Sequence, residues 1–125
     1  AVNRRRRHAL MLAAAAVLPA APPAFAHAAL VKSDPARRAT LSKPPKQLRL
    51  WFSERLEPAY ASVTLRRDGD ANDIETAKAS VDAGDPKLLV LDLPELAPGD
   101  YTVKYRVLSV DGHTVDYGYT FSIRP

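Results

Sequence analysis

The chain has 125 residues and no cysteine, with 18 lysines and arginines, 14 aspartates and glutamates and 3 histidines. A chain of this size fits one domain, and the absence of cysteine excludes a disulfide framework, thiolate metal sites and thiol catalysis.

The first 26 residues have the pattern of a secretory signal peptide. The basic run Arg4–Arg7 precedes the apolar segment Ala9–Ala21, and Ala24–Ala26 is a small-x-small cleavage site. The apolar segment is too short to span roughly 30 Å of hydrocarbon. We therefore expect cleavage rather than anchoring, by either the general secretory or the twin-arginine route. Cleavage leaves residues 27–125 as one domain in the periplasm or outside the cell.

Removing this leader also removes the net charge. The leader contains four arginines and no acidic residue, so the 18 basic residues of the chain fall to 14 and balance 14 acidic ones. Binding of nucleic acid requires a basic stripe on the protein. The balanced charge therefore argues against a nucleic-acid partner.

The rest of the chain is predicted to be β-structure. Short strands separated by turns favour a β-sandwich or a small Greek-key barrel. The polar region 68–85 is predicted to be a loop or an edge strand. Five other segments alternate apolar and polar residues or are rich in β-branched and aromatic residues, as half-buried strands are; they are Gln47–Ser53, Ala61–Arg67, Lys87–Leu93, Asp100–Ser109 and Val115–Ile123.

Only two histidines, His27 and His113, remain after cleavage. His27 would become the first residue, with a free α-amine and an imidazole Nδ1 that together close a six-membered chelate ring on a metal ion. The ordinary pKa is about 7.7–8.0 for the amine and about 6.5 for imidazole, so both can lose a proton to a metal near neutral pH. This position predicts a two-point metal ligand.

A second group of candidate ligands lies in the sequence VDGHT, residues 110–114. Asp111 and His113 would share one face of an extended segment, and Gly112 between them allows a sharper bend. An amine, two imidazoles and a carboxylate form a three-nitrogen, one-oxygen set that suits tetragonal Cu(II). The sulfur that Cu(I) prefers is missing from residues 27–125, because the single methionine, Met11, lies in the leader. The alternative is a chance histidine beside a cleavage site and an Asp-Gly pair that only forms a hairpin turn.

Two longer stretches carry a family resemblance. Residues 27–58, HAALVKSDPARRATLSKPPKQLRLWFSERLEP, and residues 96–121, LAPGDYTVKYRVLSVDGHTVDYGYTF, resemble the N-terminal and C-terminal signatures of the CopC copper-resistance proteins of the bacterial periplasm. The resemblance implies a seven-stranded Greek-key β-barrel or sandwich of cupredoxin-like or immunoglobulin-like type. Some members have a methionine-rich segment that binds Cu(I); its absence here resembles the Cu(II)-only branch.

The resemblance also implies a site and a role. One Cu(II) ion would be held by His27, Asp111 and His113. Glu54 would lie outside the ligand shell and orient a ligand, or would be a solvated charge at a strand end. We expect a monomeric copper carrier or buffer in copper homeostasis or resistance, not an enzyme, that passes its ion to an inner-membrane importer or another acceptor. The alternatives are a copper-dependent oxidative enzyme with a histidine-brace site, as in lytic polysaccharide monooxygenases, and a metal-free structural sandwich.

Overall fold

The computed structural model describes residues 28–125, so the predicted leader and His27 lie outside the described residues. The described chain is almost entirely β-structure. Its one helix is a single 3₁₀ turn, and no helix in this part of the chain is long and apolar enough to cross a bilayer. The elements are β1 (Leu30–Asp34), β2 (Thr40–Leu41), β3 (Gln47–Phe52), η1 (Pro58–Tyr60), β4 (Ser62–Arg67), β5 (Ser80–Asp82), β6 (Asp85–Asp92), β7 (Gly99–Leu108) and β8 (Thr114–Ile123).

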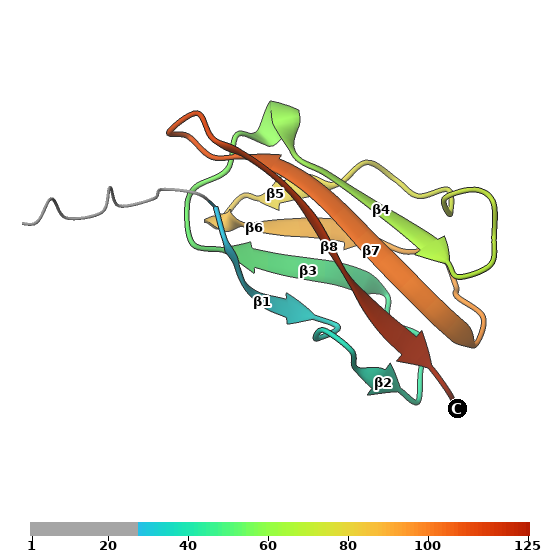
Figure 1. The fold of residues 1–125 in the computed structure, drawn as a ribbon. Helices are drawn as coiled ribbons and strands as arrows, with labels where there is room; N and C mark the ends of the chain where they lie inside the picture. The colour runs from blue at the N-terminus through green and yellow to red at the C-terminus, as the bar shows by residue number, and fades with distance from the viewer. Residues whose placement is uncertain (1–27) are drawn as a thin grey trace, which may run out of the picture.

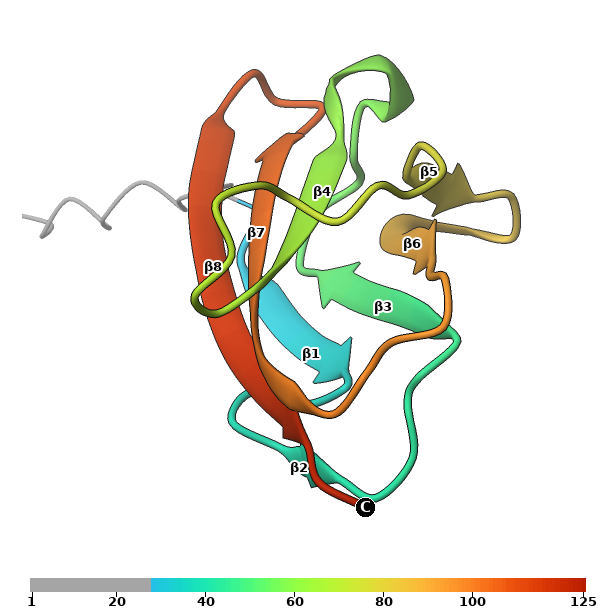
Figure 2. The same ribbon diagram turned by 90° about the vertical axis from the view of Figure 1, so that its right-hand side faces the viewer.

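The eight strands form two four-stranded sheets that face each other (Figures 1 and 2). The strand order is β1-β3-β6-β5 in the first sheet and β2-β8-β7-β4 in the second. All neighbouring strands are antiparallel except β2 and β8, which are parallel. With β2 set aside, this is the ABED and GFC order of an immunoglobulin-type sandwich.

The predicted all-β fold is confirmed, the number of strands is corrected, and the choice between sandwich and barrel is settled. The described chain has eight strands rather than seven, because the two-residue strand β2 pairs with the end of β8. It is an open sandwich rather than a closed barrel, since no strand ladder within residues 28–125 joins one sheet to the other.

The five predicted strands correspond to β3, β4, β6, β7 and β8. The expected edge strand in region 68–85 is the three-residue β5, which lies at the edge of its sheet, and the rest of that region is mostly loop. The structure also adds β1 and β2, which the strand patterns did not predict.

The core lies between the sheets and consists of the inward-facing side chains of both. Tyr101 near the start of β7 is 1 % exposed, and its ring stacks on Phe121 with the centroids 5.4 Å apart. Its hydroxyl donates a hydrogen bond of 2.5 Å to the carbonyl of Ala97. This is the tyrosine corner of immunoglobulin-type sandwiches, and it anchors β7 at the end opposite the candidate site.

Candidate metal site

The loop Ser109–His113 joins β7 to β8 and contains both described candidate ligands. The Ser109 amide donates to the His113 carbonyl at 3.0 Å, and the Gly112 amide donates to the Ser109 carbonyl at 2.9 Å. Gly112 has a φ of +93°, in the left-handed region that favours glycine. The Asp-Gly pair therefore forms a hairpin turn, and Asp111 and His113 meet across that turn rather than along an extended strand.

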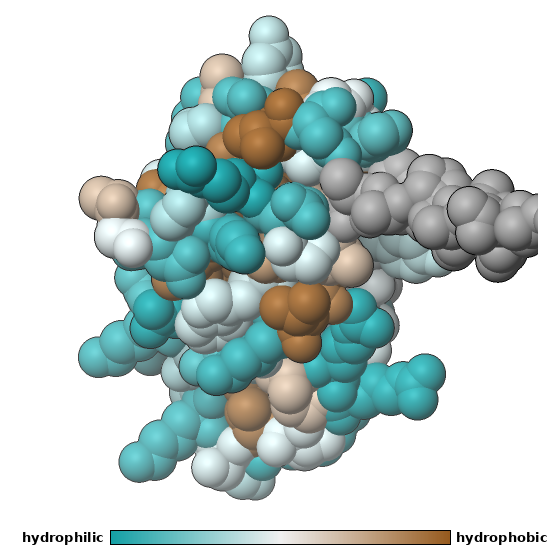
Figure 3. Space-filling model, turned by 90° about the vertical axis from the view of Figure 1, so that its left-hand side faces the viewer, coloured by the Kyte–Doolittle hydropathy of each residue, from teal (hydrophilic) through white to brown (hydrophobic). Residues whose placement is uncertain are grey.

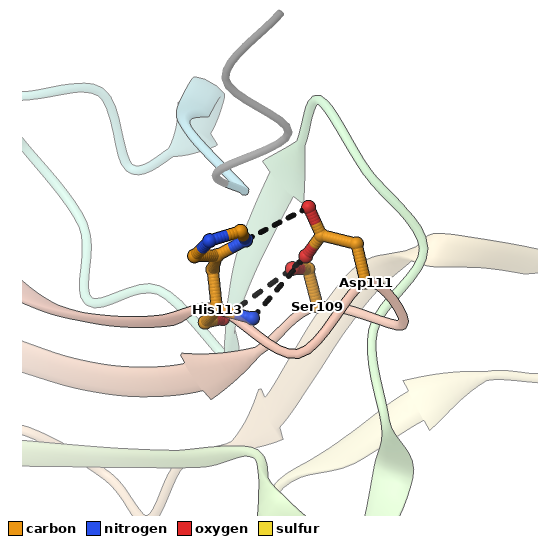
Figure 4. A network of polar contacts seen from close by, with 3 residues as sticks. All are labelled: Ser109, Asp111 and His113. Carbon is orange, nitrogen blue, oxygen red and sulfur yellow. Dashed lines mark hydrogen bonds and ion pairs between the residues drawn. The ribbon is translucent and has the colours of Figure 1, made fainter. Parts of the chain in front are cut away.

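The side chains of Asp111 and His113 point toward each other, with Ser109 beside them (Figure 4). Asp111 Oδ2 lies 3.0 Å from His113 Nδ1, and Oδ1 accepts a hydrogen bond from the His113 amide at 3.2 Å. Oδ1 also accepts a hydrogen bond from Ser109 Oγ. Both carboxylate oxygens are thus engaged, and the three contacts fix the two candidate ligands relative to each other.

The sequence analysis did not assign a role to Ser109. It is 1 % exposed, and it is the one polar residue among the fully buried side chains of the described chain. Its hydrogen bond to Asp111 is the largest influence that lowers the pKa of this carboxyl; partial desolvation opposes it, and contacts with His113 add to it. Asp111 is therefore a carboxylate at neutral pH, the form that binds a metal.

The separation of the two donor atoms is that of a hydrogen bond, and it also matches the separation of two neighbouring ligands on one metal ion. Two neighbouring ligands on one ion, each with a bond of about 2.0–2.2 Å, stand about 2.8–3.1 Å apart when they are at right angles. Asp111 Oδ2 and His113 Nδ1 have this separation. The site is accessible, because 54 % of the His113 side chain and 28 % of the Asp111 side chain are exposed.

These two residues do not form a complete site by themselves. Within residues 28–125, no group of three histidine, aspartate or glutamate side chains is placed to hold one ion.

The segment after β3 connects this loop to the start of the described chain. The Val110 amide donates to the Arg55 carbonyl at 3.0 Å. Two residues earlier, the Ser53 amide donates to the Ala29 carbonyl at 2.8 Å, and the Ala29 amide donates to Ser53 Oγ at 2.9 Å. One short segment therefore contacts both the Asp-Gly-His loop and the beginning of β1.

A surface hollow gives a second link between these regions. Its volume is about 610 Å³, and both Ala28 and Thr114 line it. Ala28 is fully buried. The residues adjacent to the two predicted histidine ligands, position 28 beside His27 and position 114 beside His113, thus border the same space.

Glu54 lies in the connecting segment, between Ser53 and Arg55, and is half-exposed. Within the described residues, no hydrogen bond or ion pair joins it to another side chain. The structure brings together Asp111 and His113, and in the described chain Glu54 is linked to their loop only through its neighbour Arg55, whose carbonyl accepts the Val110 amide.

Comparison with known proteins identifies the protein family of this chain. Residues 30–124 match the model of the CopC domain. The protein YobA of Escherichia coli K12 is 36 % identical over 104 residues, which cover 82 % of this chain and 83 % of YobA.

Two solved structures share the fold and the sequence. The crystal structure of CopC from Methylosinus trichosporium OB3b has a TM-score of 0.74 and 38 % identity, and covers 79 % of this chain and 95 % of its own. The crystal structure of PcoC, a methionine-rich copper resistance protein from Escherichia coli, has a TM-score of 0.69 and 31 % identity, and covers 79 % of this chain and 100 % of its own.

Proposed function

The chain belongs to the CopC family, as its two signature stretches predicted, and from this premise we propose that it is an exported Cu(II)-binding protein. Its role is that of a copper carrier or buffer in copper homeostasis or resistance, in the periplasm after removal of residues 1–26. The copper ion is the cargo of the protein. The name of PcoC, a copper resistance protein, supports this role.

The proposed site holds one Cu(II) ion through His27, Asp111 and His113. The observation that carries this proposal is the hollow that Ala28 and Thr114 line together. Ala28 follows His27 directly in the chain, and we propose that the terminal amine and imidazole reach the Asp-Gly-His loop across this hollow. Three nitrogens and one oxygen suit tetragonal Cu(II).

The neighbouring side chains prepare this site. Ser109 keeps Asp111 ionised and pointed at His113. Such hydrogen bonds to ligands orient them and raise metal affinity. We assign Glu54 a similar role toward a ligand, because it lies in the segment that contacts both the loop and the start of β1.

The exposure of the site suits a carrier. More than half of the His113 side chain is accessible, so an acceptor could approach the ion without unfolding of the domain. We propose that a monomer passes its ion to an inner-membrane importer or another copper acceptor.

Catalysis is not part of the proposal. Repeated redox chemistry requires a ligand set that also accommodates Cu(I), which prefers softer donors than a carboxylate. We expect the copper-loaded protein, given ascorbate and oxygen, to produce no more peroxide than free copper does. Production well above that level, or oxidation of a polysaccharide, would favour the oxidative-enzyme alternative.

Electron paramagnetic resonance during a Cu(II) titration tests the proposal. The protein that begins at His27 should bind one ion per chain, with a tetragonal spectrum that shows coupling to three nitrogens. His113→Ala should leave coupling to two nitrogens, and Asp111→Asn should keep three with a changed spectrum. A spectrum identical in all three proteins would contradict the proposed ligand set.

A further inference from the structure

Positive charge is concentrated in the first part of the described chain. Residues 50–125 contain eight basic and 13 acidic residues. Residues 28–49 contain one acidic residue, Asp34, and six basic ones, Lys32, Arg37, Arg38, Lys43, Lys46 and Arg49. The zero net charge of residues 27–125 therefore conceals a separation of charge along the chain.

Five of these cations line two surface hollows, and together we call them the basic patch: Lys32, Arg37, Lys43, Lys46 and Arg49. Lys32 and Arg37 line one hollow, and the other three line a second hollow. The ring of Trp51 joins the two groups, because Lys32 Nζ lies 4.7 Å and Arg49 Cζ 5.2 Å from its centroid. Long hydrophilic side chains project to both sides from the lower half of the molecule in Figure 3.

Neighbouring acids neutralise the patch only in part, and none in the described chain forms an ion pair with it. Asp34 and Asp92 also line the second hollow, yet no ion pair within residues 28–125 includes any of the five cations; the described ion pairs join other residues. The buried Nε of Arg49 also has no hydrogen-bond partner among these residues. Five unpaired like charges on one surface disfavour folding through mutual repulsion. Stability does not explain them, whereas an anionic partner would.

We propose that the basic patch docks the protein on an anionic lipid bilayer. The cations lie in two hollows on either side of Trp51 rather than converging on one point, so a layer of headgroups would contact them better than one small anion. Juxtaposed lysines and arginines are attracted to anionic lipids, and tryptophan favours the membrane–water interface. Val31, which is 63 % exposed beside Lys32, adds apolar surface.

Most of this patch lies away from the Asp-Gly-His loop, although Arg37 also lines the hollow that Ala28 and Thr114 border. That loop lies at the upper end of the sandwich and β2 at the lower end (Figure 1). The loop region carries charges of both signs, with Asp111, Asp116 and Glu57 beside Arg55 and Arg106, so it lacks the excess of positive charge that the patch has. The proposal does not depend on the metal-site assignment.

Vesicle sedimentation with the protein that begins at His27 tests the proposal. It should bind vesicles of phosphatidylglycerol and phosphatidylcholine in equal parts but not pure phosphatidylcholine. Binding should disappear at about 1 M salt, where the Debye length is about 3 Å. The single tryptophan of the chain is Trp51, so brominated phosphatidylglycerol should quench its fluorescence only if this face meets the bilayer.

A pair of triple variants gives the matched comparison. Lys32→Gln, Lys43→Gln and Lys46→Gln together should weaken vesicle binding by at least about tenfold. The control, Lys78→Gln, Lys87→Gln and Lys104→Gln, makes the same change in net charge at exposed lysines outside the patch and should bind as the wild type does. Circular dichroism would establish that both are folded.

Three results would overturn the proposal. One is an absence of wild-type binding to the anionic vesicles, and binding to polyglutamate in that case would indicate an acidic protein partner instead. Another is an equal loss of binding in both triple variants, which would indicate a general charge effect. The third is binding without quenching of Trp51, which would place another face against the lipid.

Discussion

The β7–β8 hairpin has a serine, an aspartate and a basic side chain in contact at each end. At the loop end, Asp111 accepts a hydrogen bond from Ser109 Oγ and lies 3.0 Å from His113 Nδ1. The serine hydroxyl is the largest influence on the pKa of Asp111, which it lowers.

At the other end, Asp100 is held in the same way. It accepts hydrogen bonds from Ser122 Oγ at 2.6 Å and from Arg124 Nη2 at 2.5 Å. Its pKa is also lowered, and the hydrogen bond from Ser122 is again the largest cause. A serine-bound aspartate with a lowered pKa is therefore not by itself the mark of a metal site.

The two groups differ in the third side chain. A guanidinium stays protonated and has no lone pair to offer a metal, whereas neutral imidazole has one. They differ also in their surroundings, because the loop group lies beside the start of the described chain. The comparison indicates that His113 and the nearby chain start distinguish the candidate metal site from a structural ion pair.

Removing the basic side chain at each end of the hairpin should give the largest difference in Cu(II) affinity. Outer-shell partners of metal ligands contribute about 10- to 100-fold to affinity, so loss of a direct ligand in His113→Ala should lower Cu(II) affinity by at least about 100-fold. Arg124→Ala should leave the affinity unchanged. Both side chains are more than half exposed, so each unfolding free energy should change by about 0.5 kcal/mol or less.

Competition titration and urea unfolding measure these two quantities. Equal copper affinities in the two variants would remove the distinction between the ends of the hairpin.

Removing the serine at each end of the hairpin should give a smaller difference in Cu(II) affinity. Ser109→Ala deletes the hydrogen bond that holds Asp111, and we expect Cu(II) affinity to fall by about 10- to 100-fold. Ser122→Ala deletes the matching bond to Asp100 and should leave the affinity as it is. If Ser109→Ala binds copper like the wild type, the buried serine serves only the structure of the turn.

Lowering the pH should reduce the contributions of Asp100 and Asp111 to stability by similar, modest amounts. Both aspartates have a pKa below the ordinary 3.8 in the folded chain, so the unfolded chain binds more protons. Their contribution to stability is present above about 3.8 and is lost as the pH falls through the folded pKa values. Carboxyl-carbon NMR titration should show each group more than half ionised at pH 3.8, and each Ser→Ala variant should raise the pKa of its own aspartate. Titration of either group at or above 3.8 would contradict these hydrogen bonds.

The sequence predicted the central strands because their burial alternates. In β3, the residues Leu48, Leu50 and Phe52 face the core and Gln47, Arg49 and Trp51 do not, a pattern with a period of two residues. In β1, by contrast, no residue is fully buried. Its strand character comes from pairing with β3, and single-chain alternation does not reveal that pairing.

The candidate site was partly predictable for a similar reason. Asp111 and His113 are close in sequence, so any turn at Gly112 keeps them close in space. The role of Ser109 depends on burial against the segment after β3, and the link to Ala29 depends on pairing between distant strands. Such long-range contacts are properties of the folded sandwich rather than of any local motif.

The most direct test of the account compares two forms of the protein in a Cu(II) competition titration. One begins at His27, verified by mass spectrometry, and the other keeps Ala26 in front of it, which converts the amine to an amide and removes one ligand. We predict tight one-to-one binding by the first form and a collapse of affinity in the second. Equal affinity in both forms would contradict the terminal chelate and the proposed site with it.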